Sequence, residues 1–253
     1  MKLIIVFCLT GLILFPSVAI SSEEYSNIFF EANQAYNKGE YEKAISLYEK
    51  LPELGIRNGL IYYNIGNCYY RNGEIGKAIL NYRKSELYNP RDEDLIANLT
   101  YARQNVKDKV EVSSSKILKR IFFWYYDLNW RELFILFLIF NGIFWTSAIL
   151  NLFKPLVLLR TLLFVFLFIM LLTGISTAAR FYTLKNLKDG VIIFREVSVR
   201  SGNSINNIVL FNLHEGTEIE ILDEKNDWLK IKLPHIQQEM KGWVERKYVG
   251  MIN

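Results

Sequence analysis

Residues 59–92 read GLIYYNIGNCYYRNGEIGKAILNYRKSELYNPRD, and they repeat a pattern that the preceding 34 residues already carry. The recurring positions are Asn33 and Asn67, Tyr36 and Tyr70, Gly39 and Gly73, Ala44 and Ala78, and Tyr48 and Tyr82. A fixed period of 34 residues is typical of paired helices that stack on one another. Glycine allows the tight turn between two helices, and alanine lets them approach closely. The sequence therefore predicts two helical repeats, residues 25–58 and 59–92.

Both units resemble the tetratricopeptide repeat family, and the second unit follows the family pattern more closely. Its matching residues are Tyr62, Gly66, Tyr69, Gly73, Ala78, Tyr82 and Pro90. The first unit departs from the pattern at Glu31 and Ile56. Residues 92–107 begin with acidic side chains, which suit a helix N-terminus, and we expect them to form the cap that stacked repeats require. The resemblance implies a tetratricopeptide repeat domain over residues 22–110.

In this family the first helix of each pair lines a concave face that binds peptides. The resemblance places there Phe29, Asn33, Tyr36, Tyr63, Asn64, Asn67 and Tyr70. The carboxylate-clamp subclass needs basic residues where this chain has Phe29, Asp94 and Asn98, so we exclude that subclass. The aromatic residues favour an apolar segment or helix as the ligand. The alternative, in which the tyrosines only pack, stays open.

The N-terminus, residues 1–21, reads MKLIIVFCLTGLILFPSVAIS. One lysine, an apolar run and then small residues predict a secretory signal peptide. An uncleaved signal anchor is the alternative, and both interpretations send the following segment across the membrane. Cys8 lies inside the apolar run without a preceding lipobox, which disfavours a lipoprotein.

Two long apolar stretches, residues 133–153 and 156–179, follow the repeats. Each is long enough to cross the hydrocarbon core of a bilayer. Lys154-Pro155 separates them, and proline disfavours helix at the preceding residue, so we expect a transmembrane hairpin. A buried pair of soluble helices would show a polar stripe, which is missing here. Neither stretch contains Asp, Glu or His, which favours an anchor over a transport role.

An aromatic and basic linker, residues 111–132, precedes the first span and is expected to meet membrane lipid. It contains IFFWYYDLNW, residues 121–130, after Lys116, Lys119 and Arg120. Aromatic residues are typical of the membrane interface, and an amphipathic helix on the membrane surface fits the pattern.

Counting membrane crossings from the signal peptide predicts that both soluble domains lie on the periplasmic side of the bacterial cytoplasmic (inner) membrane.

Residues 190–253 change to a period of two, which predicts strands. Thr217–Ile221 and Trp228–Leu233 form an expected hairpin around the polar turn 224–227. Five short segments of residues 190–253 resemble, in order, the sequence pattern of the bacterial SH3-like domain: Val197–Gly202, Leu213–Thr217, Asp227-Trp228, Gly242–Val244 and Tyr248-Val249. The resemblance implies a small β-barrel with peptidoglycan as a candidate ligand. The candidate ligand surface is Arg200, Trp228 and Trp243, with two open alternatives: the tryptophans form the core, or Arg200 fixes a loop.

Enzyme and nucleic-acid functions are excluded by what the sequence contains. The net charge is +4, but its excess lies in residues 108–187 beside the apolar spans, so we expect no nucleic-acid partner. His214 and His235 are the only histidines, and no catalytic set, metal-ligand cluster or phosphate loop accompanies them. We therefore expect no catalysis, metal or cofactor. Cys68 is interpreted as a packed residue, with a reactive thiol as the alternative.

The domain order resembles the BatE family, which is associated with bacterial aerotolerance gene clusters. This resemblance implies membrane partners with von Willebrand A domains. The predicted fold class is multi-domain α plus β: tetratricopeptide helical repeats, a two-helix transmembrane hairpin and a C-terminal small SH3-like β-barrel. The expected function is a non-enzymatic, membrane-anchored scaffold that binds partner proteins through an extracytoplasmic repeat groove within an aerotolerance-type complex. The alternative is an envelope sensor or wall-tethering protein that binds peptidoglycan through the SH3-like domain.

Overall fold

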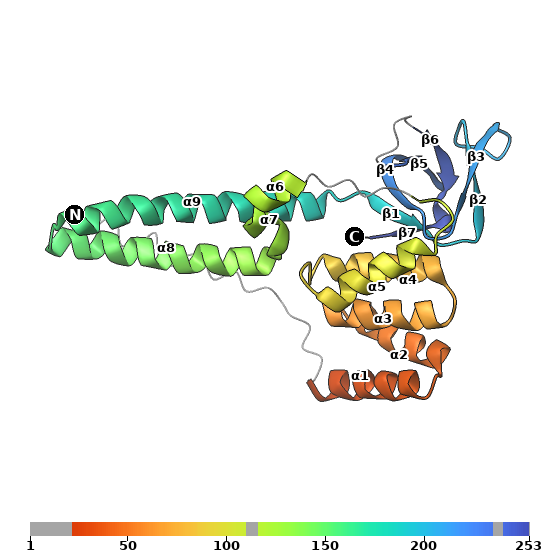
Figure 1. The fold of residues 1–253 in the computed structure, drawn as a ribbon, viewed down its shortest axis with the longest axis horizontal. Coiled ribbons are helices and arrows are strands. Elements are labelled where there is room, and N and C mark those ends of the chain that lie inside the picture. Colours follow the sequence, from red (N-terminus) through yellow and green to blue (C-terminus); the bar gives the residue numbers. More distant parts are fainter. Residues whose placement is uncertain (1–21, 110–115, 235–239, 253) are drawn as a thin grey trace. The chain divides into compact units, whose positions relative to one another are not determined.

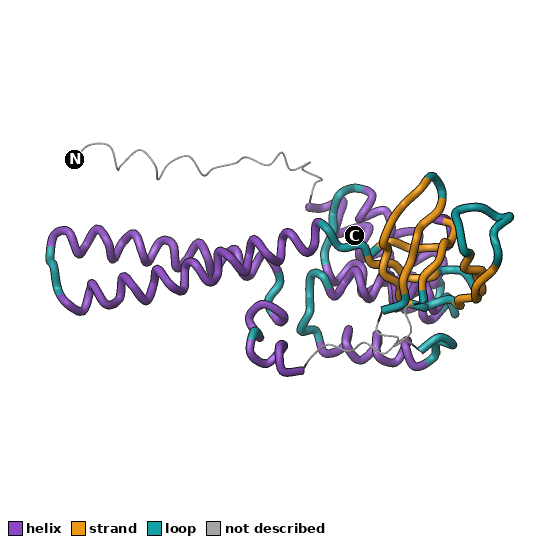
Figure 2. Tube along the Cα trace, turned by 90° about the horizontal axis from the view of Figure 1, so that it is seen from above, coloured by secondary structure: helices purple, strands orange, loops and turns teal. Residues whose placement is uncertain are grey.

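The computed structural model describes residues 22–109, 116–234 and 240–252 (Figure 1). The expected signal peptide, residues 1–21, lies outside these ranges. The chain divides into two compact units, Met1–Arg57 and Asn58–Asn253, and each is described by itself. Helices dominate as far as residue 185 and strands follow, so this is a mixed α and β chain (Figure 2).

The first unit contains the helix pair α1 (Ser22–Asn37) and α2 (Tyr41–Glu53). Gly39 lies between the two helices with a φ of 78°, a left-handed conformation that costs glycine little. Ala44, Tyr48 and Leu51 are buried on one side of α2. The residues that recur in the sequence thus make the turn and the packed side of this pair.

The second unit opens with three further helices: α3 (Gly59–Arg71), α4 (Ile75–Glu86) and α5 (Glu93–Gln104). Asn58 caps α3 by accepting a hydrogen bond from the Ile61 N–H over 2.9 Å. Asp92 caps α5 in the same way, with the Leu95 N–H at 3.0 Å. Such side-chain acceptors satisfy N–H groups that have no partner inside the helix. The helix α5 lies within the predicted capping segment 92–107.

An antiparallel helical hairpin follows, formed by α8 (Trp130–Phe153) and α9 (Val157–Lys185). The short helices α6 (Lys116–Ile121) and α7 (Phe123–Asp127) precede it. A reciprocal capping box between Asn129 and Glu132 starts α8 three residues before the apolar stretch at 133. The helix α9 continues past Ala179 because backbone hydrogen bonds do not require apolar side chains. Both helices are long and apolar enough to cross a membrane, which indicates membrane insertion.

The C-terminal part of the second unit is an antiparallel sheet in the order β3-β2-β6-β5-β4-β1-β7. Its strands are β1 (Asp189–Ile192), β2 (Glu196–Arg200), β3 (Val209–His214), β4 (Glu218–Lys225), β5 (Trp228–Lys232), β6 (Lys241–Glu245) and β7 (Val249–Met251). Alternate residues, among them Leu229, Ile231 and Val244, enter one apolar core. The predicted hairpin is confirmed, because β4 pairs with β5 around Asn226.

Within the second unit, the sheet packs directly on α4. A Cβ placed on Gly76 would lie 2.6 Å from the carbonyl oxygen of Ile192, which is closer than a real side-chain atom comes. Glycine at this position therefore lets the helix approach the backbone of β1. Leu80, one turn further along α4, contacts Gly250 of β7. The helices and the sheet share one interface.

Candidate functional site

The predicted groove residues of the first helix pair contact other residues of that pair. The Tyr48 hydroxyl donates to Asn33 Oδ1 over 2.6 Å. The ring of Phe29 lies 5.7 Å from the ring of Tyr48, and Tyr36 lies 5.6 Å from Tyr41. These three predicted residues therefore help hold α1 against α2. A binding role for the same surface stays a prediction.

The predicted groove residues of the second pair are tied to α5. Asn98 Nδ2 donates both to the Tyr63 hydroxyl, over 2.9 Å, and to Asn67 Oδ1, over 3.0 Å. Asn105 Nδ2 donates to the Tyr70 hydroxyl over 3.3 Å. Asn64 is half-buried on the same helix. Because these contacts use polar atoms that a ligand would need, the packing interpretation gains support for Tyr63 and Tyr70.

The two sets of groove residues belong to different compact units, since Phe29, Asn33 and Tyr36 precede Arg57 and the other four follow it. A single groove through all seven residues therefore stays a prediction. Within the second unit, the Tyr82 hydroxyl donates to Asn67 Oδ1 over 2.8 Å, which repeats the bond between Tyr48 and Asn33. The recurring Asn and Tyr positions thus have a structural role in each pair.

The candidate ligand surface of the SH3-like module lies on the outer face of its sheet. Trp243 of β6 is paired in register with Arg200 of β2 on one side and with Lys230 of β5 on the other. All three side chains are half-buried, whereas the neighbouring Leu229 and Val244 are fully buried on the opposite face. Cross-strand partners on one face of a sheet touch one another. One aromatic ring is therefore flanked by two cations.

Trp228 lies on this same outer face of β5, opposite Glu245 in the register. Neither tryptophan belongs to the apolar core, so the interpretation of Trp228 and Trp243 as the barrel core is wrong. The strand alternation explains this, because Leu229, Ile231 and Val244 already fill the inner positions. Arg200 Nη1 donates to the Asn207 carbonyl over 2.9 Å, which agrees with the loop-fixing interpretation.

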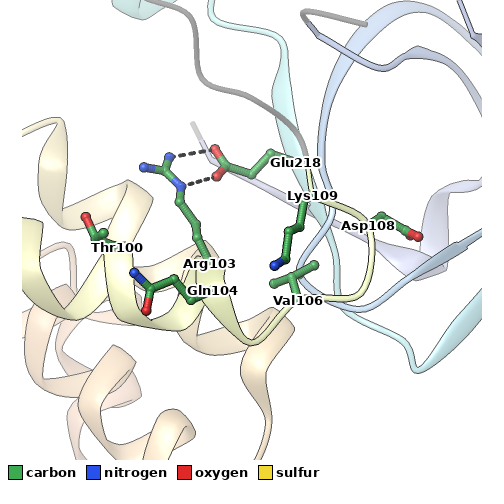
Figure 3. A pocket seen from close by; sticks show the side chains of 8 residues that line it. Thr100, Arg103, Gln104, Val106, Asp108, Lys109 and Glu218 are labelled. Atoms are coloured by element: carbon green, nitrogen blue, oxygen red, sulfur yellow. Dashed lines mark hydrogen bonds and ion pairs between the residues drawn. The ribbon is translucent and has the colours of Figure 1, made fainter.

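A cluster of ion pairs joins α4 and α5 to β4, and Figure 3 shows its pair between Arg103 and Glu218. Arg103 holds Glu218 through two N–O contacts of 2.6 and 3.1 Å, and Arg83 Nε lies 3.0 Å from the same carboxylate. Arg83 also reaches Glu86 and, over 3.5 Å, Asp189. Burial acts to lower the pKa of Arg83, but these carboxylates outweigh it and raise that pKa above its ordinary value. Arg83 therefore stays charged.

Burial also raises the pKa of Asp189 above its ordinary value, although the nearby Arg83 opposes this effect.

Beside the cluster is a pocket of about 230 Å³, lined by Thr100, Arg103, Gln104, Val106, Asp108, Lys109, Gly216 and Glu218 (Figure 3). The guanidinium group of Arg103 in this pocket is already paired with Glu218. We therefore interpret the pocket as part of the helix–sheet interface.

Asp108 makes a second connection, between the segment after α5 and the end of β3. Its Oδ2 accepts hydrogen bonds from the His214 N–H, over 2.7 Å, and from the Thr217 hydroxyl, over 2.9 Å. The His214 ring lies with Nδ1 3.1 Å from Asp108 and Nε2 2.8 Å from Lys107 Nζ. Because an ammonium group only donates, Nε2 accepts here and the ring proton is assigned to Nδ1. This imidazole serves as a connector between charged groups.

Asp108 has a lowered pKa. Burial acts to raise the pKa of this carboxyl group, but the hydrogen bonds from His214 and Thr217 outweigh burial and hold the pKa below its ordinary value. Cys68 is the opposite case, since burial raises the pKa of its thiol to about 12. Its side chain is also fully buried, which favours the packed interpretation over a reactive thiol. Among the described residues, no group of three His, Cys, Asp or Glu side chains is arranged to hold a metal ion.

The residues of this junction were not predicted as a site, yet the repeat contains a signal for them. The sheet covers one face of α4, and that face differs from the exposed, polar face of α2 at three equivalent positions: Glu42 and Gly76, Ser46 and Leu80, Glu49 and Arg83. These positions follow an i, i+4, i+7 spacing, which places them on one side of a helix. A departure from the repeat on one face thus marks an interface.

Comparison with known proteins bears on the sheet. Residues 195–250 match a family model described as the bacterial SH3 domain. These residues run from the start of β2 into β7 and include Arg200, Trp228 and Trp243. A search of curated proteins finds no match for the chain. The SH3-like prediction is thus supported, and it indicates a cell-envelope location. The tetratricopeptide and BatE resemblances stay predictions from sequence.

Proposed function

We propose that this protein is a non-enzymatic, membrane-anchored binding protein of the bacterial cell envelope, and that its SH3-like sheet binds peptidoglycan. The row Arg200, Trp243 and Lys230 on the outer sheet face carries this proposal. Peptidoglycan combines sugar rings with peptides that bear carboxylates. An indole offers a flat apolar surface, and the two flanking cations complement carboxylates.

The remaining parts of the second unit suit a tether. The apolar hairpin of α8 and α9 would hold the sheet at the membrane, and the Arg83 and Arg103 contacts with Glu218 would keep the sheet in one orientation on the helices. Membrane attachment raises the effective concentration of the sheet near the wall. In this proposal both soluble modules lie on the extracytoplasmic side, where peptidoglycan is found, as the predicted signal peptide requires.

The test uses the full chain in detergent micelles, mixed with purified sacculi and sedimented. We expect the wild type to sediment with the sacculi, and Trp243→Ala and Lys230→Gln each to reduce the retained fraction several-fold. Lys38→Gln, an exposed cation of the first unit, is the matched control and should leave retention unchanged. Equal retention of Trp243→Ala and wild type would contradict the proposal.

A scaffold role for the helices is the second candidate, favoured by apolar side chains on α5 that face solvent. Ile96 is 46 % exposed and Tyr101 is 58 % exposed. Such a surface fits an apolar helix or segment of a membrane protein, and the BatE resemblance suggests partners with von Willebrand A domains. Ile96→Glu should abolish co-purification with such a partner, while the exposed Lys225→Gln should not. Unchanged recovery of the partner with Ile96→Glu would rule out this surface.

A further inference from the structure

The hairpin gives each residue of α9 a depth in the bilayer. This helix starts at Val157, directly after the turn at Pro155. At 1.5 Å per residue, Ser176 lies about 29 Å and Arg180 about 35 Å along the helix axis. The hydrocarbon core of a bilayer is about 30 Å thick. In a hairpin that spans the bilayer upright from its turn, Ser176 would mark the far boundary of the core, and Arg180 would lie at the depth of the lipid phosphates.

Aromatic residues surround α9 at this depth. Trp124 Nε1 of α7 donates to Ser176 Oγ over 3.3 Å, and the Tyr125 hydroxyl lies 3.3 Å from Thr183 Oγ1. The ring of Trp130 lies 6.4 Å from the ring of Phe181. We call Trp124, Tyr125, Trp130 and Phe181 the aromatic collar. Figure 1 shows α7 beside the same end of α9.

Two arginines stack on the collar, and neither has an ionic partner within the part of the chain that the structure describes. The guanidinium carbon of Arg180 lies 5.7 Å from the ring centre of Tyr125, and that of Arg131 lies 5.7 Å from Trp130. Arg180 Nε is buried and has no hydrogen-bond partner among the described residues. The nearby carboxylate of Glu132 is bonded to Arg91 instead. A guanidinium group at the edge of an apolar region is costly without a counter-ion, so an anion at the Nη groups of Arg180 would stabilise it.

The surface next to the collar is apolar. Ile117, Ile121 and Phe123 are 73 %, 55 % and 59 % exposed. Side chains of this kind are stable when they enter the boundary between headgroups and acyl chains. On α9 itself, Ile175 next to Ser176 is 68 % exposed, so lipid would cover apolar side chains on both elements. Apolar side chains exposed at this level favour the bilayer itself as the source of the anion.

We propose that Arg180 and Arg131, stacked on the aromatic collar, bind the phosphate of an anionic phospholipid headgroup. A guanidinium group offers parallel N–H donors that fit two phosphate oxygens, and the ring beneath it fixes its orientation. The collar would thus select anionic lipid and set the depth and rotation of the hairpin. The inference rests on membrane insertion of α8 and α9, and it is independent of peptidoglycan binding.

The test reconstitutes the full chain in nanodiscs of phosphatidylcholine with a minor share of phosphatidylglycerol. Native mass spectrometry then counts the lipids of each kind that stay bound. We expect phosphatidylglycerol to be enriched over its share in the bilayer, and Arg180→Gln to reduce this enrichment about fivefold. Arg160→Gln, at the turn end of the same helix, is the matched control and should change the enrichment little.

Two further variants separate lipid binding from misfolding. Arg180→Lys keeps the charge but loses the paired donors, so it should bind less anionic lipid than the wild type and more than Arg180→Gln. Tyr125→Leu removes the ring and should also lower the enrichment. Arg180→Gln should keep the wild-type hydrogen exchange of amides in the sheet and in α9, which would show that the fold is intact. No enrichment in the wild type, or an equal loss with Arg160→Gln, would overturn the proposal.

Discussion

The two helix pairs follow one sequence pattern, but their second helices face different surroundings. In each pair a tyrosine of the second helix donates to an asparagine of the first, Tyr48 to Asn33 and Tyr82 to Asn67. The outer face of α2 is polar and exposed, whereas the same face of α4 is covered by the sheet. The shared positions therefore determine how the two helices of a pair fold together. The positions that differ determine whether the outer face of the second helix meets solvent or the sheet.

The clearest difference lies at one repeat position, which holds Glu49 in the first pair and Arg83 in the second. Glu49 is exposed, whereas the side chain of Arg83 is 21 % exposed and contacts Glu218. A mostly buried cation is stable only with its carboxylate partners. The comparison can be tested by changing equivalent residues in the two pairs and measuring each unit separately.

The largest effect is expected for Arg83→Ala. The variant leaves Glu218, Glu86 and Asp189 without one cation, so the second unit should lose about 3 kcal/mol in its free energy of unfolding. The matched variant Glu49→Ala should change the first unit by no more than about 0.5 kcal/mol. Hydrogen exchange of amides in α4 and α2, measured on the full chain in micelles, reports the two units. Equal losses in both would show that the cluster does not hold the second unit.

Asp108→Asn should have the next largest effect, about 1.5 kcal/mol at neutral pH, because the ionised carboxylate accepts stronger hydrogen bonds than an amide. The pKa of Asp108 is below its ordinary value in the folded chain. The stability it adds is therefore present above the ordinary pKa and is lost as the pH falls through the folded pKa. The difference between variant and wild type should shrink in acid. A constant difference from neutral to acidic pH would contradict this assignment.

The fold was predictable from sequence where the signal is local. The 34-residue period, the proline between two apolar stretches and the alternation in Thr217–Ile221 each depend on neighbours within a few turns or strands. A membrane-spanning helix can be predicted from its length and apolar composition alone, and α8 and α9 have both properties. Such patterns can be read from the sequence before any tertiary contact is known.

The junction was not predictable from single residues, because its partners lie far apart. Arg103 and Glu218 are separated by 115 positions, and Asp108 lies in the charged run 107–109, which resembles a solvated linker. The sequence also left open whether Trp228 and Trp243 point outward, as a ligand surface requires, or into the core. Tryptophan is often buried, but on these strands smaller apolar residues hold the inner positions. Only the register of three strands shows which face each ring occupies.

The repeated Tyr–Asn bond allows a direct comparison of the two pairs. Tyr48→Phe leaves Asn33 Oδ1 without its hydroxyl donor, whereas after Tyr82→Phe the Asn67 oxygen still accepts from Asn98. We expect Tyr48→Phe to cost the first unit about 1 kcal/mol and Tyr82→Phe to cost the second about half as much. Amide exchange in α1 and α3 measures both. A larger cost for Tyr82→Phe would show that α5 does not compensate for the lost hydroxyl.

The smallest effect on stability is expected at a second repeated contact, the ion pair at the N-terminus of α2 and of α4. Lys43 lies 3.2 Å from Glu40, and Lys77 lies 2.6 Å from Glu74. Lys77 also lies 5.0 Å from the ring centre of Tyr69. Exposed pairs of this kind contribute little, so Lys43→Gln should change the first unit by about 0.3 kcal/mol or less.

Lys77→Gln should cost the second unit about 0.5 kcal/mol more than Lys43→Gln costs the first, because the variant also loses the cation–π contact. Burial acts to raise the pKa of Glu74, but hydrogen bonds from Lys77 and Asn72 outweigh it and hold the pKa below its ordinary value. The ion-pair part of the effect should therefore disappear as the pH falls through that pKa, and the contact with Tyr69 should persist. An effect of Lys77→Gln that vanishes completely in acid would assign all of it to Glu74 and none to the ring.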